Sequence, residues 1–376
     1  MRILYISRHN PFGTTGGGDM ASHAYLKAFS RLSGGDIDVC IASHIQEADA
    51  EIRTRSIYRV PPRDMLHKCL SVFTGETHRY TAFVKALLKR NTDYDICVFD
   101  HSSIAGTLVR YVNALNIKTV TIHHNFEAAY YRDNSGSVER ALFLRHVKAC
   151  EKKAYKESAW NLFLSDSDRK QFSKYYGDSR GRNEIIGVFN YYNETLDFRE
   201  RNNDLEHLTF AITGTMSNYQ TVDGVVDYLN SYHAMLPSGA SLIIAGRNPA
   251  EDIYKAAARY DNVRIVANPE NMQDVLLDAD VYICPIKLGS GVKLRVLDAV
   301  KAGLPSLCHE VSYRGYELFD DTCLVEYRNP DEFAAALTRM LNHMKNKECT
   351  AAAFREAYEK TFTFEAGLRR LQSIML

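Results

Sequence analysis

Short apolar segments alternate with longer segments of helical periodicity along most of the chain. The apolar segments are only about four residues long and lack a polar face, which is typical of strands buried on both sides of a sheet. Helix-length segments such as Met20–Leu32 and Ser103–Leu115 separate them. This alternation predicts parallel sheets built from βαβ units, so we expect an α/β protein. The apolar segments include Ile3–Ser7, Val39–Ala42, Ile96–Phe99, Thr119–Ile122, Asn161–Leu164, Phe210–Thr213, Leu242–Ala245, Val263–Val266, Val281–Cys284 and Ser306–Cys308.

The alternation occurs twice, which predicts two domains. The first series ends before about residue 190, and the second begins near Leu208 after a polar, charged stretch around Asn193–Glu206. A chain of 376 residues is also longer than one hydrophobic core usually serves. We expect one Rossmann-like domain over residues 1–192 and a second over 193–355, with a C-terminal helix over 356–376.

Composition is that of an ordinary globular protein. Hydrophobic residues make up 45% and charged residues 24%, and no stretch is long and apolar enough to cross a membrane. The first residues look like a strand rather than a secretion signal, so we expect a cytoplasmic protein. The eight cysteines lie far apart without a C-x-x-C pair, which favours reduced core residues over a metal or redox site.

Charge is balanced overall but uneven along the chain. The formal net charge of zero argues against a nucleic-acid partner. Residues 53–90 nevertheless contain nine Lys and Arg against two acidic residues, a formal charge of +7, and residues 145–156 form a second basic run. Basic segments that also contain apolar residues bind anionic lipid surfaces, so peripheral association with the inner face of the plasma membrane is one interpretation. A solvated helical face is the other.

In open parallel sheets, ligands bind beyond the carboxyl ends of the strands, so the residues after each apolar run are the candidates. After the first run comes a glycine-rich loop in which Gly17 and Gly18 open a helix, a place where backbone N–H groups can meet an anion. It does not match the G-x-G-x-x-G dinucleotide pattern. After Thr119–Ile122, His123, His124 and Glu127 supply groups for a hydroxyl-rich ligand.

The second half contains three further loops of this kind. Gly214, Thr215 and Met216 follow one apolar run, and Arg247 follows the next. The third loop combines glycines, two lysines and a helix start, which suit a diphosphate. Asp298, inside the helix that follows, stands among apolar neighbours, and ribose hydroxyls would be suitable partners for its carboxylate. The candidates in the third loop are Lys287, Ser290, Gly291, Val292 and Lys293.

A metal site is not expected. D-x-D pairs, which can hold a divalent cation, occur at four places. Three of them precede an apolar run and so belong to the wrong end of the sheet, and the fourth, Asp166/Asp168, reads as a helix N-cap region. The histidine pair lacks further ligands at zinc spacing. We therefore expect neither a metal nor a cofactor, with a nucleotide sugar as co-substrate.

The segment from Gly289 to Pro305 resembles the donor-site signature of retaining GT-B glycosyltransferases of group 1. The turns at Gly214 and Gly246, and the stretch His124-Asn125-Phe126-Glu127, are similar to a branch that builds capsule and exopolysaccharide sugars. The resemblance covers nearly the whole chain. It implies a GT-B fold, in which two Rossmann-like domains with parallel sheets face a central cleft. It also implies that the C-terminal segment crosses back onto the first domain.

The same resemblance implies the roles of the site residues. The first domain would bind a glycan or lipid-linked glycan acceptor, with His123 or His124 near the transferred sugar. The second would bind the nucleotide sugar, with Asp298 on the ribose. Two glutamates of the family pattern are replaced by Ser290 and Asp298, and Ser217-Asn218-Tyr219-Gln220 stands where the wider family has a basic pair. Arg247, Lys287 and Lys293 are then the candidates to neutralise the diphosphate.

Two other functions fit some of these features. A GT-B nucleotide-sugar epimerase would need acids and bases around one sugar and no acceptor site. A nucleotide-sugar-binding module without turnover would explain the replaced glutamates. We expect a glycosyltransferase of hexosyl type that acts in surface polysaccharide synthesis without a metal, with retention implied by the resemblance alone.

Overall fold

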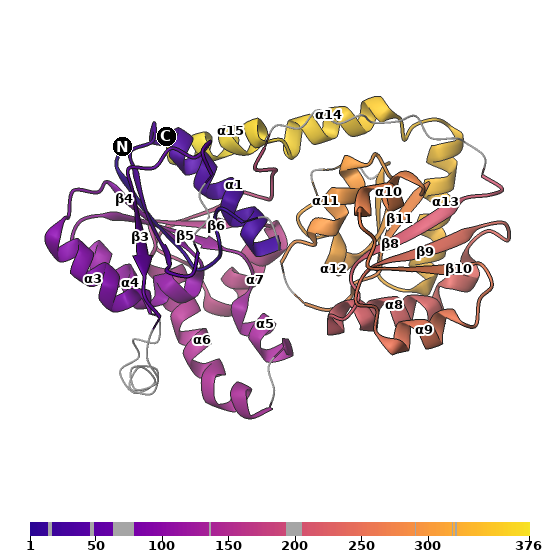
Figure 1. Ribbon diagram of the computed structural model, residues 1–376, viewed down its shortest axis with the longest axis horizontal. Helices are drawn as coiled ribbons and strands as arrows, with labels where there is room; N and C mark the ends of the chain where they lie inside the picture. Colours follow the sequence, from indigo (N-terminus) through magenta and orange to yellow (C-terminus); the bar gives the residue numbers. More distant parts are fainter. Residues whose placement is uncertain are drawn as a thin grey trace. The chain divides into compact units, whose positions relative to one another are not determined.

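The computed structural model describes residues 1–13, 17–45, 49–62, 79–134, 137–192, 205–289, 291–317, 319 and 322–376. The chain divides into two compact units (Figure 1). Unit 1 consists of Met1–Asn193 together with Phe362–Leu376, and unit 2 of Glu194–Thr361.

Unit 1 is built on a parallel sheet of seven described strands. Their order is β3-β2-β1-β4-β5-β6-β7, so β1 lies in the middle and the chain extends the sheet first to one side and then to the other. Every described pairing in it is parallel, as the buried apolar runs predict. The strands are β1 (Ile3–Ser7), β2 (Ile37–Ala42), β3 (Ser56–Val60), β4 (Ile96–Asp100), β5 (Lys118–His123), β6 (Trp160–Phe163) and β7 (Arg182–Ile185).

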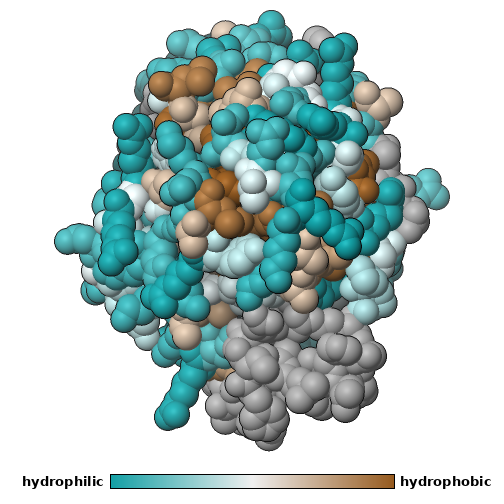
Figure 2. Space-filling model, turned by 90° about the vertical axis from the view of Figure 1, so that its left-hand side faces the viewer, coloured by the Kyte–Doolittle hydropathy of each residue, from teal (hydrophilic) through white to brown (hydrophobic). Residues whose placement is uncertain are grey.

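Helices pack on both faces of this sheet (Figure 1). A hydrophobic core joins β1 and β4 to α3 and α4, and partly buried Tyr58, Phe83 and Leu87 pack against its edge. Figure 2 looks onto this side of unit 1, where hydrophobic residues emerge in small groups between hydrophilic ones. The helices are α1 (Gly17–Leu32), α3 (Tyr80–Arg90), α4 (Ser102–Asn113), α5 (Glu127–Asn134), α6 (Ser137–Glu157), α7 (Asp166–Tyr176) and α15 (Phe364–Met375).

Helix α15 belongs to unit 1 although it ends the chain. It packs against α1, and Arg370 Nε donates to Ile186 O at 2.9 Å. Gly367 packs directly against the ring of Phe189, and a Cβ at this position would come within 2.1 Å of the ring. Residues 356–376 do not form the single helix that was expected. A new helix begins after Thr363, because its side chain accepts the N–H of Ala366 as an N-cap.

Unit 2 repeats the architecture with a parallel sheet in the order β10-β9-β8-β11-β12-β13. Its largest core cluster joins β8, β9 and β11 to α8, α9 and α13. The strands are β8 (Thr209–Thr215), β9 (Ser241–Arg247), β10 (Val263–Ala267), β11 (Val281–Cys284), β12 (Ser306–His309) and β13 (Leu324–Tyr327). The helices are α8 (Tyr219–Ser231), η1 (His233–Met235), α9 (Glu251–Ala257), α10 (Met272–Leu277), α11 (Leu294–Lys301), α12 (Glu310–Tyr313), α13 (Pro330–Lys345) and α14 (Ala351–Thr361).

These two sheets confirm the expected α/β class, and each apolar run named above contributes to a strand. Three further strands, β3, β7 and β13, are not among the named runs. β3 and β7 are sheet edges with exposed polar residues, so they lack the pattern of a buried strand. None of the described cysteines forms a disulfide bond, and most are buried, as expected. None of the described helices is long and apolar enough to span a bilayer.

Candidate functional site

Three neighbouring strands of unit 1 end in polar residues. β1, β4 and β5 lie side by side and run in the same direction, so their carboxyl ends meet at one edge of the sheet. β1 ends at Ser7, β4 at Asp100 and β5 at His123, which His124 follows. The register pairs Ser7 with Asp100 and Asp100 with Ile122. Strand order thus brings together residues that are far apart in the sequence.

Asp100 is the centre of this cluster. Its carboxylate is fully buried and accepts hydrogen bonds from Ser7 Oγ at 2.7 Å and from His124 Nε2 at 2.5 Å. Burial by itself would raise the pKa of this carboxyl group, but the interactions with His124, His9 and Ser22 together outweigh burial and hold the pKa below its ordinary value. Asp100 is therefore ionised beside His124 and keeps a proton on Nε2 of the imidazole.

His124 has the geometry of a group that exchanges a proton or binds a hydroxyl. Because Nε2 donates to Asp100, a neutral ring has its free lone pair on Nδ1. Its ring centroid lies 5.2 Å from that of His9. Burial, and then the neighbouring His124, lower the pKa of His9 to about 3. His9 is thus neutral near pH 7.

A second pair lies beside the first. His101 Nδ1 accepts the N–H of Ser103 at 3.2 Å, and Nε2 lies 3.2 Å from Arg8 NH1 and 3.3 Å from Glu127 Oε1. Burial opposes the ionisation of Glu127, but the neighbouring His101, Arg8 and Asn125 together outweigh burial and lower the pKa of Glu127 to about 2. His101 also has a φ of 139°, which side chains rarely adopt. Backbone strain of this kind persists only where surrounding contacts hold it, and it is common at functional sites.

A buried glutamate side chain holds the start of α5. Glu151 accepts the backbone N–H of Glu127 at 2.6 Å and of Ala128 at 3.2 Å, and the hydroxyl of Tyr176 at 2.7 Å. The first two contacts satisfy N–H groups that a helix start leaves free. Burial raises the pKa of Glu151 to about 8 in spite of these donors. Glu151 could not be singled out from the sequence, because nothing there distinguishes it from the other acidic residues of α6.

His123 belongs to the core and not to the strand-end cluster. It has no exposed area, its Nε2 lies 2.9 Å from Asn161 Oδ1, and its ring stacks on Phe163 with centroids 4.9 Å apart. Burial lowers the pKa of His123 to about 4, so the ring is neutral. Side chains alternate between the faces of a strand, which separates His123 from His124. The expectation that either histidine contacts the sugar is therefore narrowed to His124.

The glycine-rich loop of unit 1 reaches the same cluster. Gly17 opens α1, and a Cβ on Gly18 would lie 2.6 Å from the ring of His9. Glycine at this position thus lets the His9 ring lie against the start of the helix. The rest of the loop, residues 14–16, lies outside the described residues.

In unit 2, the turns after β8 and β9 pack tightly against each other. A Cβ on Gly246 would lie 1.8 Å from Gly214 O, so the close approach requires glycine. The backbone N–H of Met216 donates to Arg247 O at 2.8 Å. Met216 is fully buried, whereas Thr215 and Arg247 are exposed. Of these candidates, only Thr215 and Arg247 can reach a ligand with a polar side chain.

The loop from β11 to α11 depends on left-handed glycines. Gly289 and Gly291 have φ values of 92° and 73°. Ser290, between them, lies outside the described residues. Val292 packs against Gly315, where a Cβ would come within 2.5 Å of the valine methyl group. These glycines bend the loop so that it enters α11 at the carboxyl end of β11.

Lys293 is the N-cap residue of α11, and its backbone is held in place. The hydroxyl of Tyr316 donates to Lys293 O at 3.0 Å and accepts the N–H of Leu297 at 3.1 Å. Asp298 lies one turn further on and is exposed. The interpretation of Asp298 as a carboxylate among apolar neighbours is wrong, because the helix turns its apolar residues inward and Asp298 outward. Its carboxylate remains accessible to a ligand.

Lys287 differs from the other basic candidates because aspartates already balance its charge. Its Nζ lies 3.0 Å from Asp227 and 3.8 Å from Asp223, both on α8. Burial opposes the charged form, but Asp227 and Asp223 together outweigh burial and raise the pKa of Lys287. An ammonium group held by two carboxylates has less charge to offer a diphosphate, which argues against Lys287 as a main contact.

Arg295 is a basic residue that the sequence analysis did not single out. Its NH1 donates to Thr213 O at 3.1 Å and its NH2 to Thr221 Oγ1 at 3.3 Å. The guanidinium lies against Gly214, where a Cβ would come within 2.3 Å of NH1. The side chain thus reaches from the first turn of α11 to the end of β8. Only the adjacency of β8 and β11 reveals this position.

No group of three or more His, Cys, Asp or Glu among the described residues could hold a metal ion. The D-x-D residue Asp38 is buried, and accepts hydrogen bonds from Tyr94 at 2.7 Å and Arg2 at 3.3 Å. Asp38 therefore has a structural role and is not accessible to a ligand.

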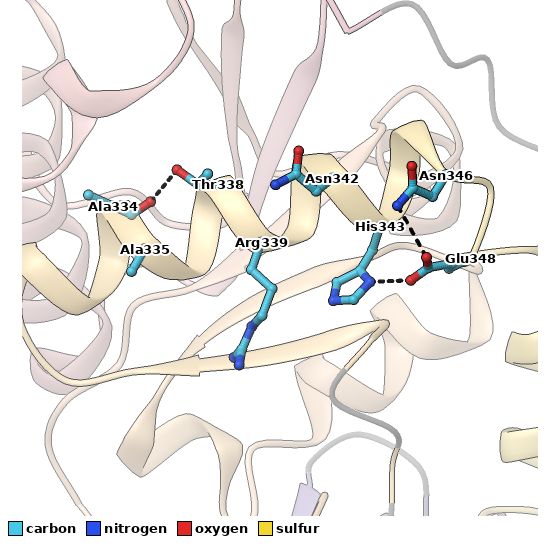
Figure 3. Close-up of a pocket in the computed structure, with 8 residues that line it drawn as sticks. All are labelled: Ala334, Ala335, Thr338, Arg339, Asn342, His343, Asn346 and Glu348. Atoms are coloured by element: carbon cyan, nitrogen blue, oxygen red, sulfur yellow. Dashed lines mark hydrogen bonds and ion pairs between the residues drawn. The ribbon is translucent and has the colours of Figure 1, made fainter.

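Two surface hollows lie away from the strand-end clusters. One, of about 590 Å³, runs along the outer side of α13, where His343 pairs with Glu348 (Figure 3). The other, of about 600 Å³, lies at the amino ends of β5, β6 and β7 and includes Lys118, Arg180 and Arg182. Neither includes a residue of the candidate sites.

Comparison with known proteins supports this arrangement in unit 2. Residues 207–343 match the family described as glycosyl transferases group 1. The matched segment contains the Gly214 and Gly246 turns and the loop into α11. A protein of Klebsiella pneumoniae, described as an uncharacterized 44.6 kDa protein in the cps region, is 23% identical over 318 residues, which are 80% of each chain.

Solved structures show that the fold is of the GT-B glycosyltransferase type. The lipopolysaccharide outer core galactosyltransferase WaaB superposes with a TM-score of 0.69 at 13% identity, over 99% of this chain and 98% of WaaB. Alr3699/HepE of Anabaena, in complex with UDP, superposes with a TM-score of 0.65 at 10% identity, over 100% and 99% of the two chains. The expected fold is thereby confirmed.

Proposed function

We propose that this protein is a glycosyltransferase that takes a sugar from a nucleoside diphosphate sugar bound by unit 2. The match of residues 207–343 to glycosyl transferases group 1 carries the proposal. Within that segment, the ends of β8, β9 and β11 meet at one edge of the sheet, where ligands of such sheets bind. HepE, similar in fold, is described in complex with UDP and with UDP-glucose, which supports a nucleotide sugar as the donor.

In this proposal the donor diphosphate lies at the start of α11. Lys293 and Arg247 supply positive charge, and the loop glycines let backbone N–H groups approach the phosphate oxygens. The exposed carboxylate of Asp298 accepts hydrogen bonds from the ribose hydroxyls. Thr215 offers a hydroxyl beside the β8 turn. No cation is needed, because side chains and the helix start take over charge neutralisation.

The Asp100–His124 pair is the proposed reactive group of unit 1. Asp100 orients the imidazole, so that Nδ1 of His124 is the atom that meets a hydroxyl of the transferred sugar or of the acceptor. Glu127 and His101 form the polar wall beside it. A glycan acceptor matches such a site, because its hydroxyl groups pair with imidazole and carboxylate groups.

The reaction replaces one bond at the anomeric carbon by another. The oxygen of an acceptor hydroxyl bonds to that carbon, the bond to the diphosphate oxygen breaks, and the nucleoside diphosphate leaves with the electron pair. With net retention, the departing phosphate oxygen takes the acceptor proton. The positive groups of unit 2 stabilise the charge on the leaving group, which is the largest contribution expected in such a transfer.

The setting we propose is surface polysaccharide synthesis at the inner face of the plasma membrane. The relative from a cps region supports a role in polysaccharide synthesis. A lipid-linked glycan acceptor fits the basic surface of α6 and α7, where Lys148 lies over the ring of Tyr175 at 5.6 Å. Tyr175 is 54% exposed at this surface, so its ring is accessible beside the ammonium group of Lys148.

One experiment separates this function from its rivals. The protein is screened by thermal shift against UDP, GDP, ADP, CDP and their sugars, since a ligand at 100 times its Kd adds about 2.7 kcal/mol of stability. The stabilising donor is then incubated with and without lipid-linked glycan, and the products are separated. Sugar transfer only with acceptor supports the proposal. Epimerised donor without acceptor supports an epimerase, and binding without any turnover supports a binding module.

A further inference from the structure

We infer that Arg295 is a diphosphate-binding residue of the donor site. Its guanidinium would contact the phosphates from the carboxyl end of β8. This inference rests on the proposed function of unit 2. Arg295 was not among the basic residues expected to contact the diphosphate, because in the sequence it lies inside the helix and not in the loop before it. Its contacts instead place the guanidinium at the carboxyl end of β8, beside the Gly214 turn.

The hydrogen bonds of Arg295 hold the guanidinium in place and leave other N–H groups to donate to a ligand. A guanidinium has five N–H donors in a rigid plane. In the described part of the chain, one N–H is donated to Thr213 O and one to Thr221 Oγ1, and no carboxylate pairs with the group. The remaining donors and the full positive charge are available to an anion, and the side chain is only partly buried.

The location of Arg295 on α11 is unfavourable without an anion. The residue stands in the first turn of the helix, two positions after the N-cap Lys293, and that turn contains no acidic residue. Positive charges near a helix N-terminus oppose the helix dipole, whereas an anion there is stabilised. Two cations at this end are therefore arranged for a bound anion rather than for the stability of the empty helix.

The other basic candidates of unit 2 are less well placed than Arg295 to bind a diphosphate. Lys287 is already paired with Asp223 and Asp227. Arg247 is exposed at the end of β9, the neighbouring strand. Of these three residues, Arg295 is pre-oriented by two hydrogen bonds, so little side-chain entropy is lost when it binds a phosphate. Its planar donors also suit two phosphate oxygens at once.

A matched pair of variants tests this role. Arg295→Gln removes the charge, and Arg259→Gln is the control. Arg259 is also in unit 2, and its guanidinium likewise donates to a backbone carbonyl, Ala256 O, and to a side-chain oxygen, Asn230 Oδ1. Calorimetric titration compares the nucleoside diphosphate that stabilises the wild-type protein with the nucleoside alone.

We expect Arg295→Gln to bind the diphosphate about 10- to 100-fold more weakly, as the loss of charge-assisted hydrogen bonds predicts, and the nucleoside as the wild-type protein does. Arg259→Gln should bind both normally. Unchanged diphosphate affinity in Arg295→Gln overturns the inference, and so does an equal loss for both ligands, which identifies Arg295 as a support of the β8 turn only.

Failure of the proposed function would look different, because the wild-type protein itself would then bind no nucleoside diphosphate. If Arg295→Gln does not fold, Arg295→Lys replaces it. Lysine keeps the charge but cannot hold both Thr213 and Thr221 while it contacts two phosphate oxygens. Selective weakening of diphosphate binding in Arg295→Lys supports the inference, and wild-type affinity contradicts it.

Discussion

His124 donates its Nε2 proton to Asp100 across the adjacent ends of β5 and β4, at 2.5 Å. The two residues are separated by a complete helix and strand in the sequence. Their pairing leaves Nδ1 of His124 as the functional atom of the ring. It also gives a buried aspartate the partner that an ionised carboxylate needs in the interior.

Replacement of His124 by Ala should reduce sugar transfer by about 10²- to 10⁴-fold, the usual contribution of a proton-handling or orienting side chain. Binding of nucleoside diphosphate should not change, because the proposed diphosphate contacts all lie in unit 2. Kinetic assays with saturating donor measure the first effect and calorimetry the second. His44→Ala, at an exposed position of unit 1, is the control. Full activity in His124→Ala would remove the residue from the mechanism.

Lys293→Ala should weaken the binding of both nucleoside diphosphate and intact donor by about tenfold or more, because the lost contact belongs to the leaving group. Its backbone role at the N-cap survives the change, since Tyr316 bonds to the carbonyl oxygen and not to the side chain. Lys255→Ala, on the exposed side of α9, is the control. Unchanged diphosphate affinity would show that Lys293 has no such role.

Activity should survive treatment with EDTA, because the proposed site neutralises the diphosphate with side chains and a helix start. Transfer assays before and after chelation test this directly, and the chelated protein is also assayed with added Mg²⁺ or Mn²⁺. Loss of activity on chelation and recovery with either ion would replace this mechanism by a metal-dependent one.

The sequence predicts the secondary structure of this protein better than it predicts the candidate site. Apolar runs predict most strands. Helix N-caps can also be predicted from the local sequence: after β6, Ser165 accepts the N–H of Asp168, as the local pattern indicates. Contacts between distant segments are not readable. Asp100 is merely the residue after a predicted strand until β1, β4 and β5 are known to be neighbours. The exposure of Asp298 and the reach of Arg295 depend in the same way on helix rotation and strand order.

Glu151 should make stability depend on pH. Burial raises its pKa from 4.5 to about 8 in the folded protein. A group whose folded pKa is raised contributes stability that is present below the unfolded value and lost as the pH rises through the folded value. The wild-type protein should therefore lose stability relative to Glu151→Gln between about pH 4.5 and 8, by ~1.4 kcal/mol for each unit of pKa shift. Urea unfolding at pH 5.5, 7 and 8.5 measures this difference, and a constant offset between the two proteins would contradict it.

The last prediction concerns the surface that would hold a lipid-linked acceptor. On α6, Arg145 and Lys152 are exposed and lie seven positions apart, on the same side of the helix. Lys148 lies between them and over Tyr175. Basic groups beside an aromatic ring are suited to the interface of an anionic bilayer, where each Lys or Arg adds about 1 kcal/mol. In the other basic stretch, residues 53–90, Arg79 is among the described residues, while Arg63 and Lys68 lie outside them.

Conversion of Arg145, Lys148 and Lys152 to Glu should therefore reduce co-sedimentation with vesicles of anionic lipid by more than about 100-fold, because three favourable contacts are lost and become repulsive. Nucleotide binding should not change. Lys255, Arg264 and Lys345, exposed residues of unit 2, provide a triple Glu variant with the same change in charge. High salt should release the wild-type protein, since surface electrostatics are screened. If the wild-type protein sediments equally with neutral and anionic vesicles, and the first triple variant still transfers sugar to a lipid-linked acceptor at the normal rate, this surface does not dock on a membrane and a soluble acceptor is favoured.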